Sequence, residues 1–348
     1  MPATPPVGAV LVAIPVLNEV ERIGAVLDQL RLDLPQDRAV RFLVLDGGSR
    51  DGTQAEVRRA ALRDPRVELV HNPGRLQSAA VNLAASLALP EETFLLRCDA
   101  HTAYPAGFVG AAVDALVVRQ ADSVVVPMDS AGTTAFGKAT AWVSDTPLGS
   151  GGSAHRGGRT SGFVDHGHHA GWTIACFRAV GGYDESYSHN EDAELDCRIV
   201  GMGMRIWLES DIRLTYFVRP TPTALARQYR NYGRGRSRTA RRHSGSIRLR
   251  QMAVPSAMVT LALAAGGGLL IDPLLLALPA IYIAALMVVS IHVALRHRAF
   301  CGLLAGLAAF LMHAAWTWGF LVGLITIRER RWHFPGGLPV IPASYPAE

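Results

Sequence analysis

Charged residues and cysteines are both scarce in this sequence. Only 18% of its 348 residues are charged and 49% are hydrophobic, which is too apolar for an ordinary soluble enzyme. The cysteines form no CxxC pair, so their scattered positions exclude a zinc ribbon or a disulfide framework and predict reduced thiols. They are Cys98, Cys176, Cys197 and Cys301.

Acidic residues are absent from the stretch 227–250, which carries nine arginines, and the runs that follow it lack charge altogether. Residues 251–271, 273–295 and 299–327 contain no Asp, Glu, Lys or Arg. A membrane span needs about 20 apolar residues, so each run is long enough to cross a bilayer. Buried helices of a soluble protein are the alternative, but three such runs in succession are hard to bury.

The distribution of arginines predicts an orientation in the membrane. The positive-inside rule places the stretch 227–250, and the domain before it, in the cytoplasm. We therefore expect a multi-pass membrane protein whose N-terminal domain is cytoplasmic. The third run leaves two alternatives open, because a single crossing would put Arg328 and the arginines after it outside. It is either a tilted span or a re-entrant pair broken near His313 or Gly319.

The N-terminal part alternates between strand and helix patterns. No basic stretch precedes its first apolar run, 8–17, so we expect a buried strand there and no signal peptide. The alternation favours a parallel sheet covered by helices, whose ligands lie at the carboxyl ends of the strands. Asp46 and Asp99 follow two such strands, so one nucleotide could contact both. The predicted strands are 9–14, 41–45, 67–70 and 93–97.

Further patterns complete the predicted organisation. We expect Asn18 to cap the first helix, active-site loops over 129–170, a strand over 172–177 and a helix over 191–201. The chain is thus predicted to comprise a catalytic domain, a basic juxtamembrane segment, a membrane region of about three hydrophobic segments and a tail. The bounds are 1–226, 227–250, 251–327 and 328–348.

Two acidic positions about ninety residues apart carry the predicted chemistry. Asp99 and His101 follow a strand, where a carboxylate suits a divalent cation that bridges phosphates, and Mn²⁺ also accepts imidazole. A plain surface turn is the alternative. Such a pair suits the transfer of a sugar from a nucleotide-diphosphate donor to the hydroxyl of an acceptor. Asp192 is the candidate general base for that hydroxyl, with Glu191 beside it. Helix-terminal carboxylates without a catalytic role are the alternative for this pair.

Other polar residues are predicted to bind the nucleotide. Asp46, with Glu19 and Asn18, suits a base N–H or a ribose hydroxyl, although caps and turns explain these residue types too. Arg75 follows a glycine and precedes a helix, so it could reach a diphosphate.

The basic segment before the first apolar run has two competing interpretations. Docking on anionic lipid headgroups is one, and clamping of a leaving diphosphate is the other. We favour the donor site for Gln228, Arg230 and Arg234, while simple snorkelling beside a membrane helix suits 238–250. A nucleic-acid partner is disfavoured because the run abuts an apolar run and not an aromatic-lined groove.

A histidine-rich string also invites a functional interpretation. Asp165, His166, His168 and His169 crowd one loop, which gives poor tetrahedral geometry for zinc. We therefore favour contacts to the acceptor, together with Trp172.

Taken in order, these motifs resemble the family 2 glycosyltransferases, whose GT-A fold is a Rossmann-like mixed sheet that binds a nucleotide sugar. The strings 164–169 and 187–192 are most similar to ExoA-type glucosyltransferases of succinoglycan synthesis. His101 departs from the family pattern, which has a second Asp there, and Tyr232 stands where processive synthases carry Trp. The matching pieces are 14–19, 46–53, 72–74 with Ala80 and Asn82, 99–101 and 182–192.

The resemblance implies an α/β GT-A domain followed by transmembrane helices, and it implies roles for residues. Glu19 and Asp46 would contact uridine, with Pro15 beside them. Asp99 and His101 would hold Mn²⁺ or Mg²⁺, and Asp192 would be the base.

The implied reaction is an inverting transfer of a single sugar, glucose from UDP-glucose, in β-linkage. The implied acceptor is a saccharide on a polyprenyl diphosphate in exopolysaccharide biosynthesis, with membrane lipids as partners and a homo-oligomer left open. A processive polysaccharide synthase is one alternative, but an export channel needs more spans. A non-catalytic nucleotide-sugar-binding scaffold is another, which Asp99 and Asp192 disfavour.

Overall fold

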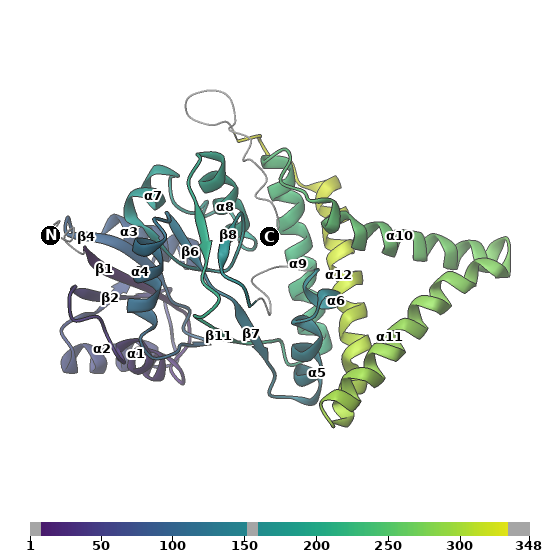
Figure 1. Ribbon diagram of the computed structural model, residues 1–348, viewed down its shortest axis with the longest axis horizontal. Helices are drawn as coiled ribbons and strands as arrows, with labels where there is room; N and C mark the ends of the chain where they lie inside the picture. The colour runs from purple at the N-terminus through teal and green to yellow at the C-terminus, as the bar shows by residue number, and fades with distance from the viewer. Residues whose placement is uncertain (1–7, 152–158, 333–348) are drawn as a thin grey trace. The chain divides into compact units, whose positions relative to one another are not determined.

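The computed structural model describes residues 8–151 and 159–332 (Figure 1). The described chain forms two compact units. The first comprises residues 8–128 and 159–216, and the second comprises 129–151 and 217–332.

The first unit is built on a mixed eight-stranded sheet in the order β3-β2-β1-β4-β9-β6-β10-β8. Strands β1 to β4 run parallel, whereas β9 lies antiparallel between β4 and β6, and β8 is antiparallel to β10. A short pair, β5 with β11, lies outside this sheet. The strands are β1 (Ala9–Val16), β2 (Val40–Asp46), β3 (Val67–His71), β4 (Glu92–Arg97), β5 (Thr102–Ala103), β6 (Ser123–Val125), β8 (Gly162–Val164), β9 (His169–Thr173), β10 (Ile206–Leu208) and β11 (Leu214–Phe217).

Helices cover both faces of the sheet, as Figure 1 shows. Val10, Val12 and Ile14 of β1 point to one hydrophobic cluster with α1, α2 and α4, while Leu11 and Ala13 point to another with α3, α7 and α8. Both sets are fully buried, which explains why β1 is apolar at every position. The helices are α1 (Ile23–Arg31), α2 (Thr53–Arg63), α3 (Gln77–Ser86), α4 (Phe108–Val118), α7 (Ile174–Ala179) and α8 (Glu191–Gly201).

Two local predictions are wrong. Helix α1 begins at Ile23, so Asn18 does not cap it; Asn18 adopts a left-handed φ of 57°, and its side-chain oxygen accepts a hydrogen bond from Arg50 N at 2.9 Å. The predicted strand 172–177 ends at Thr173, whose hydroxyl accepts from Cys176 N and starts α7. In both places a side-chain hydrogen bond outweighs the apolar pattern.

The second unit is mainly helical, and it includes part of the stretch that we expected to form active-site loops. Strand β7 (Met128–Ala131) leads into α5 (Ala135–Ser144) and α6 (Pro147–Ser150). The basic segment forms α9 (Pro222–Arg242). The apolar runs form α10 (Leu249–Leu270), η1 (Pro273–Leu276), α11 (Ala277–Arg296), η2 (Phe300–Leu304) and α12 (Ala305–Thr326).

Within the part of the chain that the structure describes, three helical segments are long and apolar enough to cross a membrane: Gln251–Leu270, Pro273–Arg296 and Phe300–Thr326. The last continues as helix through His313 and Gly319, so the break that a re-entrant pair would need at these residues is not there.

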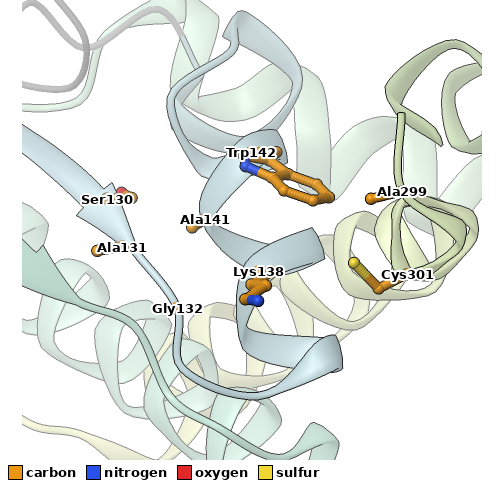
Figure 2. A pocket seen from close by; sticks show the side chains of 8 residues that line it. All are labelled: Ser130, Ala131, Gly132, Lys138, Ala141, Trp142, Ala299 and Cys301. Atoms are coloured by element: carbon orange, nitrogen blue, oxygen red, sulfur yellow. The ribbon is translucent and has the colours of Figure 1, made fainter. Parts of the chain in front are cut away.

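A hollow of about 450 Å³ lies beside α5 in the second unit (Figure 2). Lys138, the only lysine in the sequence, is exposed at its wall. Trp142 lines it as well and stacks on His297, with ring centroids 4.1 Å apart. The remaining lining residues are Ser130, Ala131, Gly132, Ala141, Ala299 and Cys301.

Candidate active site

The carboxyl ends of four parallel strands meet at one edge of the sheet. Because β1, β2, β3 and β4 are parallel neighbours, the residues that end or follow them gather at that edge. The predicted donor-site residues of the first unit lie in or just after these strands, namely Pro15, Asn18, Glu19, Asp46, Arg75 and Asp99.

Asp46 organises the turn after β2. Its carboxylate accepts hydrogen bonds from Gly48 N at 3.0 Å, from Ser49 N at 3.1 Å and from the Gln54 amide at 2.7 Å. Burial raises the pKa of Asp46, but these hydrogen bonds outweigh it and leave the pKa below its ordinary value. Arg75 lies against the same turn and donates from Nε to Gly47 O at 3.2 Å. The turn therefore holds an ionised carboxylate and a guanidinium together.

Glu19 links the end of β1 to the turn after β2. Its backbone N–H donates to the Thr53 hydroxyl at 2.8 Å, and Oε1 of its carboxylate lies 3.7 Å from His101 Nδ1. The nearby His101 is the main reason why the pKa of Glu19 lies below its ordinary value. His101 thus faces Glu19 as well as following Asp99 in sequence.

Arg97 is a buried cation between Asp99, the predicted cation ligand, and Asp192, the predicted general base. Its Nε lies 3.1 Å from Asp99 Oδ1, and its Nη1 lies 2.7 Å from Asp192 Oδ1. The same Nη1 donates to the Tyr183 hydroxyl at 2.9 Å, and that hydroxyl donates to Asp192 Oδ1 at 2.6 Å. Although Asp99 and Asp192 are far apart in sequence, one guanidinium holds both.

The charges of this cluster shift its pKa values. Burial raises the pKa of Asp99, but Arg97 and the nearby His101 and His168 outweigh it, so the pKa of Asp99 lies below its ordinary value. Burial alone would lower the pKa of Arg97, yet its carboxylate partners raise it well above the usual range. Glu191 behaves differently, since burial and then repulsion by Asp192 raise its pKa to about 7.

His168 lies between the same carboxylates. Its Nε2 is 4.0 Å from Asp99 Oδ2, and its Nδ1 is 3.9 Å from Asp192 Oδ2. His166, by contrast, turns to α8, where its Nδ1 lies 2.7 Å from the fully buried Asp196. The structure thus brings His168, but not the His166 ring, to the carboxylate pair.

The other two residues predicted to contact the acceptor are Trp172 and His169. Trp172 is fully buried in β9 and packs against Phe177 and Tyr183, with ring centroids 5.0 and 5.7 Å apart. It therefore stabilises the core and offers no surface to an acceptor, which corrects the expectation. His169 begins β9, but its side chain lies outside the described part of the structure.

The protein's own groups supply only part of a cation site. Across residues 8–151 and 159–332, no three His, Cys, Asp or Glu side chains are arranged to hold a metal. Asp99 offers a carboxylate, and the imidazoles of His101 and His168 lie near it. Mn²⁺ accepts imidazole more readily than Mg²⁺ does, and a cation held by so few protein groups would need further oxygen ligands, such as those of a diphosphate.

Gln228, Arg230 and Arg234 belong to the second unit, on α9. Gln228 donates to the Tyr232 hydroxyl at 3.0 Å, and Arg230 and Arg234 are exposed. Their predicted contact with the diphosphate stays a prediction.

Sequence reasoning missed Arg97, Tyr183 and Asp196. Arg97 had a recognisable signal, because an arginine that ends an apolar strand run is rarely buried without a partner. Tyr183 and Asp196 had none, since their roles depend on partners distant in sequence, Arg97 for Tyr183 and His166 for Asp196.

Comparison with known proteins identifies relatives of this arrangement. The sequence profile described as Glycosyl transferase family 2 matches residues 11–172. Succinoglycan biosynthesis protein ExoA of Rhizobium meliloti (strain 1021) is 42% identical over 321 residues, which cover 92% of this chain and 96% of that protein.

Solved structures share the fold. A mannosyltransferase from Pyrobaculum calidifontis, PcManGT, in complex with GDP-Man and Mn²⁺, aligns with a TM-score of 0.56 and 20% identity over 92% of this chain and 87% of its own. GalNAc-T7 with UDP, GalNAc and Mn²⁺ gives 0.51 and 13% identity over 70% of this chain and 52% of its own. These neighbours confirm the predicted GT-A-like mixed sheet.

Proposed function

The chain belongs to glycosyltransferase family 2, and we propose that it transfers one glucose from UDP-glucose, in β-linkage, to a saccharide carried by a polyprenyl diphosphate. The name of the R. meliloti relative supports a role in making an exopolysaccharide of the succinoglycan type. The observation that carries the proposal is the placing of Asp99 and Asp192 on one buried guanidinium.

Asp192 is the proposed general base. Its Oδ1 is engaged by Arg97 and Tyr183, so Oδ2, on the His168 side, is the oxygen that we assign to the acceptor hydroxyl. The hydroxyl oxygen attacks the anomeric carbon while its proton passes to Oδ2, and the bond to the diphosphate oxygen breaks on the opposite face. One displacement of this kind inverts an α-linked donor to a β-linked product.

The residues proposed to bind the donor are those that the sequence predicted. Asp46 and Glu19, with Pro15 and Asn18, would bind the nucleoside, while Arg75 and the α9 residues Gln228, Arg230 and Arg234 would bind the diphosphate. Asp99 with His101 would hold Mn²⁺ or Mg²⁺, which neutralises charge on the departing diphosphate. Arg97 keeps a positive charge beside Asp99 in every state of the reaction.

The proposed location is the bacterial inner membrane, with the catalytic unit in the cytoplasm. The nine arginines of 227–250 precede the first apolar run, and the positive-inside rule places them on the cytoplasmic side.

A donor screen tests the proposal. Membranes containing the protein are incubated with lipid extract and, separately, UDP-glucose, UDP-galactose or GDP-mannose, and the product is analysed by mass spectrometry and by NMR of the anomeric proton. We expect one hexose added in β-configuration from UDP-glucose, at a rate about 10²–10⁴-fold lower with Asp192→Asn. Long polymers would favour a processive synthase instead, and donor binding without product would favour a scaffold.

A further inference from the structure

We propose that only two of the three apolar runs cross the membrane: α10 and α11 form a crossing hairpin, whereas α12 lies along the membrane surface against α9. Both ends of the membrane region then face the side that holds the catalytic unit. The proposal rests on packing within the second unit and is independent of the donor and the acceptor proposed above.

The three runs have different surroundings. In their most apolar windows, 17% of residues are buried in the first run and 6% in the second, but 39% in the third. Helix α11 buries one narrow face, with Leu286, Ser290 and Val293, and exposes large apolar side chains over the rest of its circumference, as expected of a helix that mostly faces lipid. These are Leu278, Ile281, Ile283, Met287, Val288, Ile291 and Leu295.

Helix α12 packs lengthwise on α9, and the two run in the same direction (Figure 1). Glycines set the close approach: a Cβ at Gly319 would overlap the carbonyl oxygen of Arg230, and one at Gly323 would overlap the Ser237 hydroxyl. Near the end of the pair, the Arg241 guanidinium donates to Leu324 O. Because the two helices pack this closely, α9 must lie at the same depth in the membrane as α12.

Helix α9 cannot occupy the hydrocarbon core. Its exposed face carries a line of arginines along most of its length, and each arginine at mid-bilayer depth makes insertion less favourable. These arginines are Arg227, Arg230, Arg234 and Arg241. Because a crossing by α12 would carry this line through the bilayer, the packing argues against that crossing.

The outer side of α12 suits a membrane surface. Its exposed large side chains are Leu307, Phe310, Trp318 and Ile325. They recur at helical spacing on one side, while Gly319, Phe320 and Gly323 are buried. Helix α12 supplies the apolar residues of the α9–α12 pair and α9 supplies its arginines, and a pair that combines the two suits the interface better than the hydrocarbon core.

The residues that follow α12, and the turn between α10 and α11, agree with this arrangement. After α12, Glu329 pairs with Arg238 and, at 3.3 Å, with Arg242, so the chain returns to the C-terminal end of α9. Arg328, Arg330 and Arg331 then lie on the same side as the arginines of α9, which satisfies the positive-inside rule. Asp272, at the tip between α10 and α11, is the one charged residue left for the far side.

Cysteine accessibility in the full chain tests the proposal. Leu274→Cys, Ile283→Cys and Arg330→Cys are each treated with a membrane-impermeant maleimide in intact spheroplasts and after permeabilisation, with the parent chain as the baseline for native cysteines. We expect Leu274→Cys to be labelled in intact spheroplasts, Arg330→Cys only after permeabilisation, and the mid-helix Ile283→Cys in neither. Labelling of Arg330→Cys in intact spheroplasts, or protection of Leu274→Cys there, overturns the proposal.

Reporter fusions give a second measurement without any substitution. We expect the unchanged chain with a C-terminal green fluorescent protein to fluoresce and the same chain with C-terminal alkaline phosphatase to be inactive. The reverse pair of results overturns the proposal. Neither outcome bears on the sugar transfer reaction, so failure here is distinct from failure of the proposed function.

Discussion

The buried Arg97 and the partly buried Asp192 form an ion pair, with Nη1 of Arg97 2.7 Å from Oδ1 of Asp192. The same guanidinium binds Asp99, so the residue proposed to bind a cation and the residue proposed to take the proton share one fixed positive charge. The Tyr183 hydroxyl bridges the pair, because it accepts a hydrogen bond from Arg97 and donates one to Asp192.

Removal of this charge should destabilise the protein and slow transfer. Arg97→Met leaves the buried Asp99 and the partly buried Asp192 without their cation, which should lower the free energy of unfolding by about 3–5 kcal/mol. Thermal unfolding in detergent measures this loss. The control is Arg59→Met, whose exposed pair with Glu56 should contribute below about 1 kcal/mol. Equal losses in the two variants would contradict the role of Arg97.

The proposed base is tested by a charge-removing substitution. Asp192→Asn should lower the transfer rate by about 10²–10⁴-fold, because the amide cannot accept the acceptor proton. UDP binding, measured by calorimetry, should persist. Asp211→Asn, a change at an exposed position, should leave both quantities unchanged. Unaltered transfer in Asp192→Asn would remove Asp192 from the role of base.

Glu191 predicts a pH dependence of stability. Its pKa is raised from 4.5 to about 7, so between these values the folded state keeps a proton that the unfolded state has lost. Stability should therefore fall by up to about 3 kcal/mol as the pH rises from 4.5 through 7, and it should be retained at lower pH. Glu191→Gln should remove this slope. Tm measured at pH 5, 6, 7 and 8 tests it, and parallel curves for the two proteins would refute it.

Asp99→Ala should weaken donor binding that depends on a cation. Calorimetry of UDP-sugar binding with and without Mn²⁺ should show that Mn²⁺ strengthens binding to the parent protein and has little effect on the variant. His101→Ala separates the two ligands: an undiminished Mn²⁺ effect in that variant would leave Asp99 as ligand and exclude His101.

The contact between α9 and α12 depends on glycine. Gly319→Ala should force the two helices apart and lower the free energy of unfolding by about 1–3 kcal/mol, because its Cβ would meet the Arg230 backbone. Gly266→Ala is the matched control, since nothing lies within 4 Å of a Cβ there. That change should be neutral or stabilise α10 by up to about 1 kcal/mol. Thermal unfolding distinguishes the two.

The sequence predicted those features that depend on local pattern. The uniformly apolar β1 indicated a strand buried on both faces, and helix 191–201 agrees with α8 to the residue. The pattern could not show that β9 inserts antiparallel between β4 and β6, because strand order follows from contacts distant in sequence. Asn18 failed as a cap for a similar reason, since its side chain is used by the loop after β2.

Some residues of the candidate site could likewise be predicted from the sequence pattern, and others could not. Residues that end parallel strands could be placed at one edge from the alternation alone, as Asp46 and Asp99 were. Arg97 could not be assigned its partner, because Asp192 lies 95 residues further along the chain. The burial of Trp172 was hidden for another reason: an indole suits a sugar surface and a hydrophobic core equally well, and only the packing decides.

Lys138, at the wall of the hollow beside Trp142, has a practical consequence. Since the sequence has no other lysine, an amine-reactive fluorophore finds one side chain to modify, besides the terminal amino group. A dye placed there would report on the second unit without any engineered residue, and a lysine-specific protease would cut the polypeptide into two fragments only.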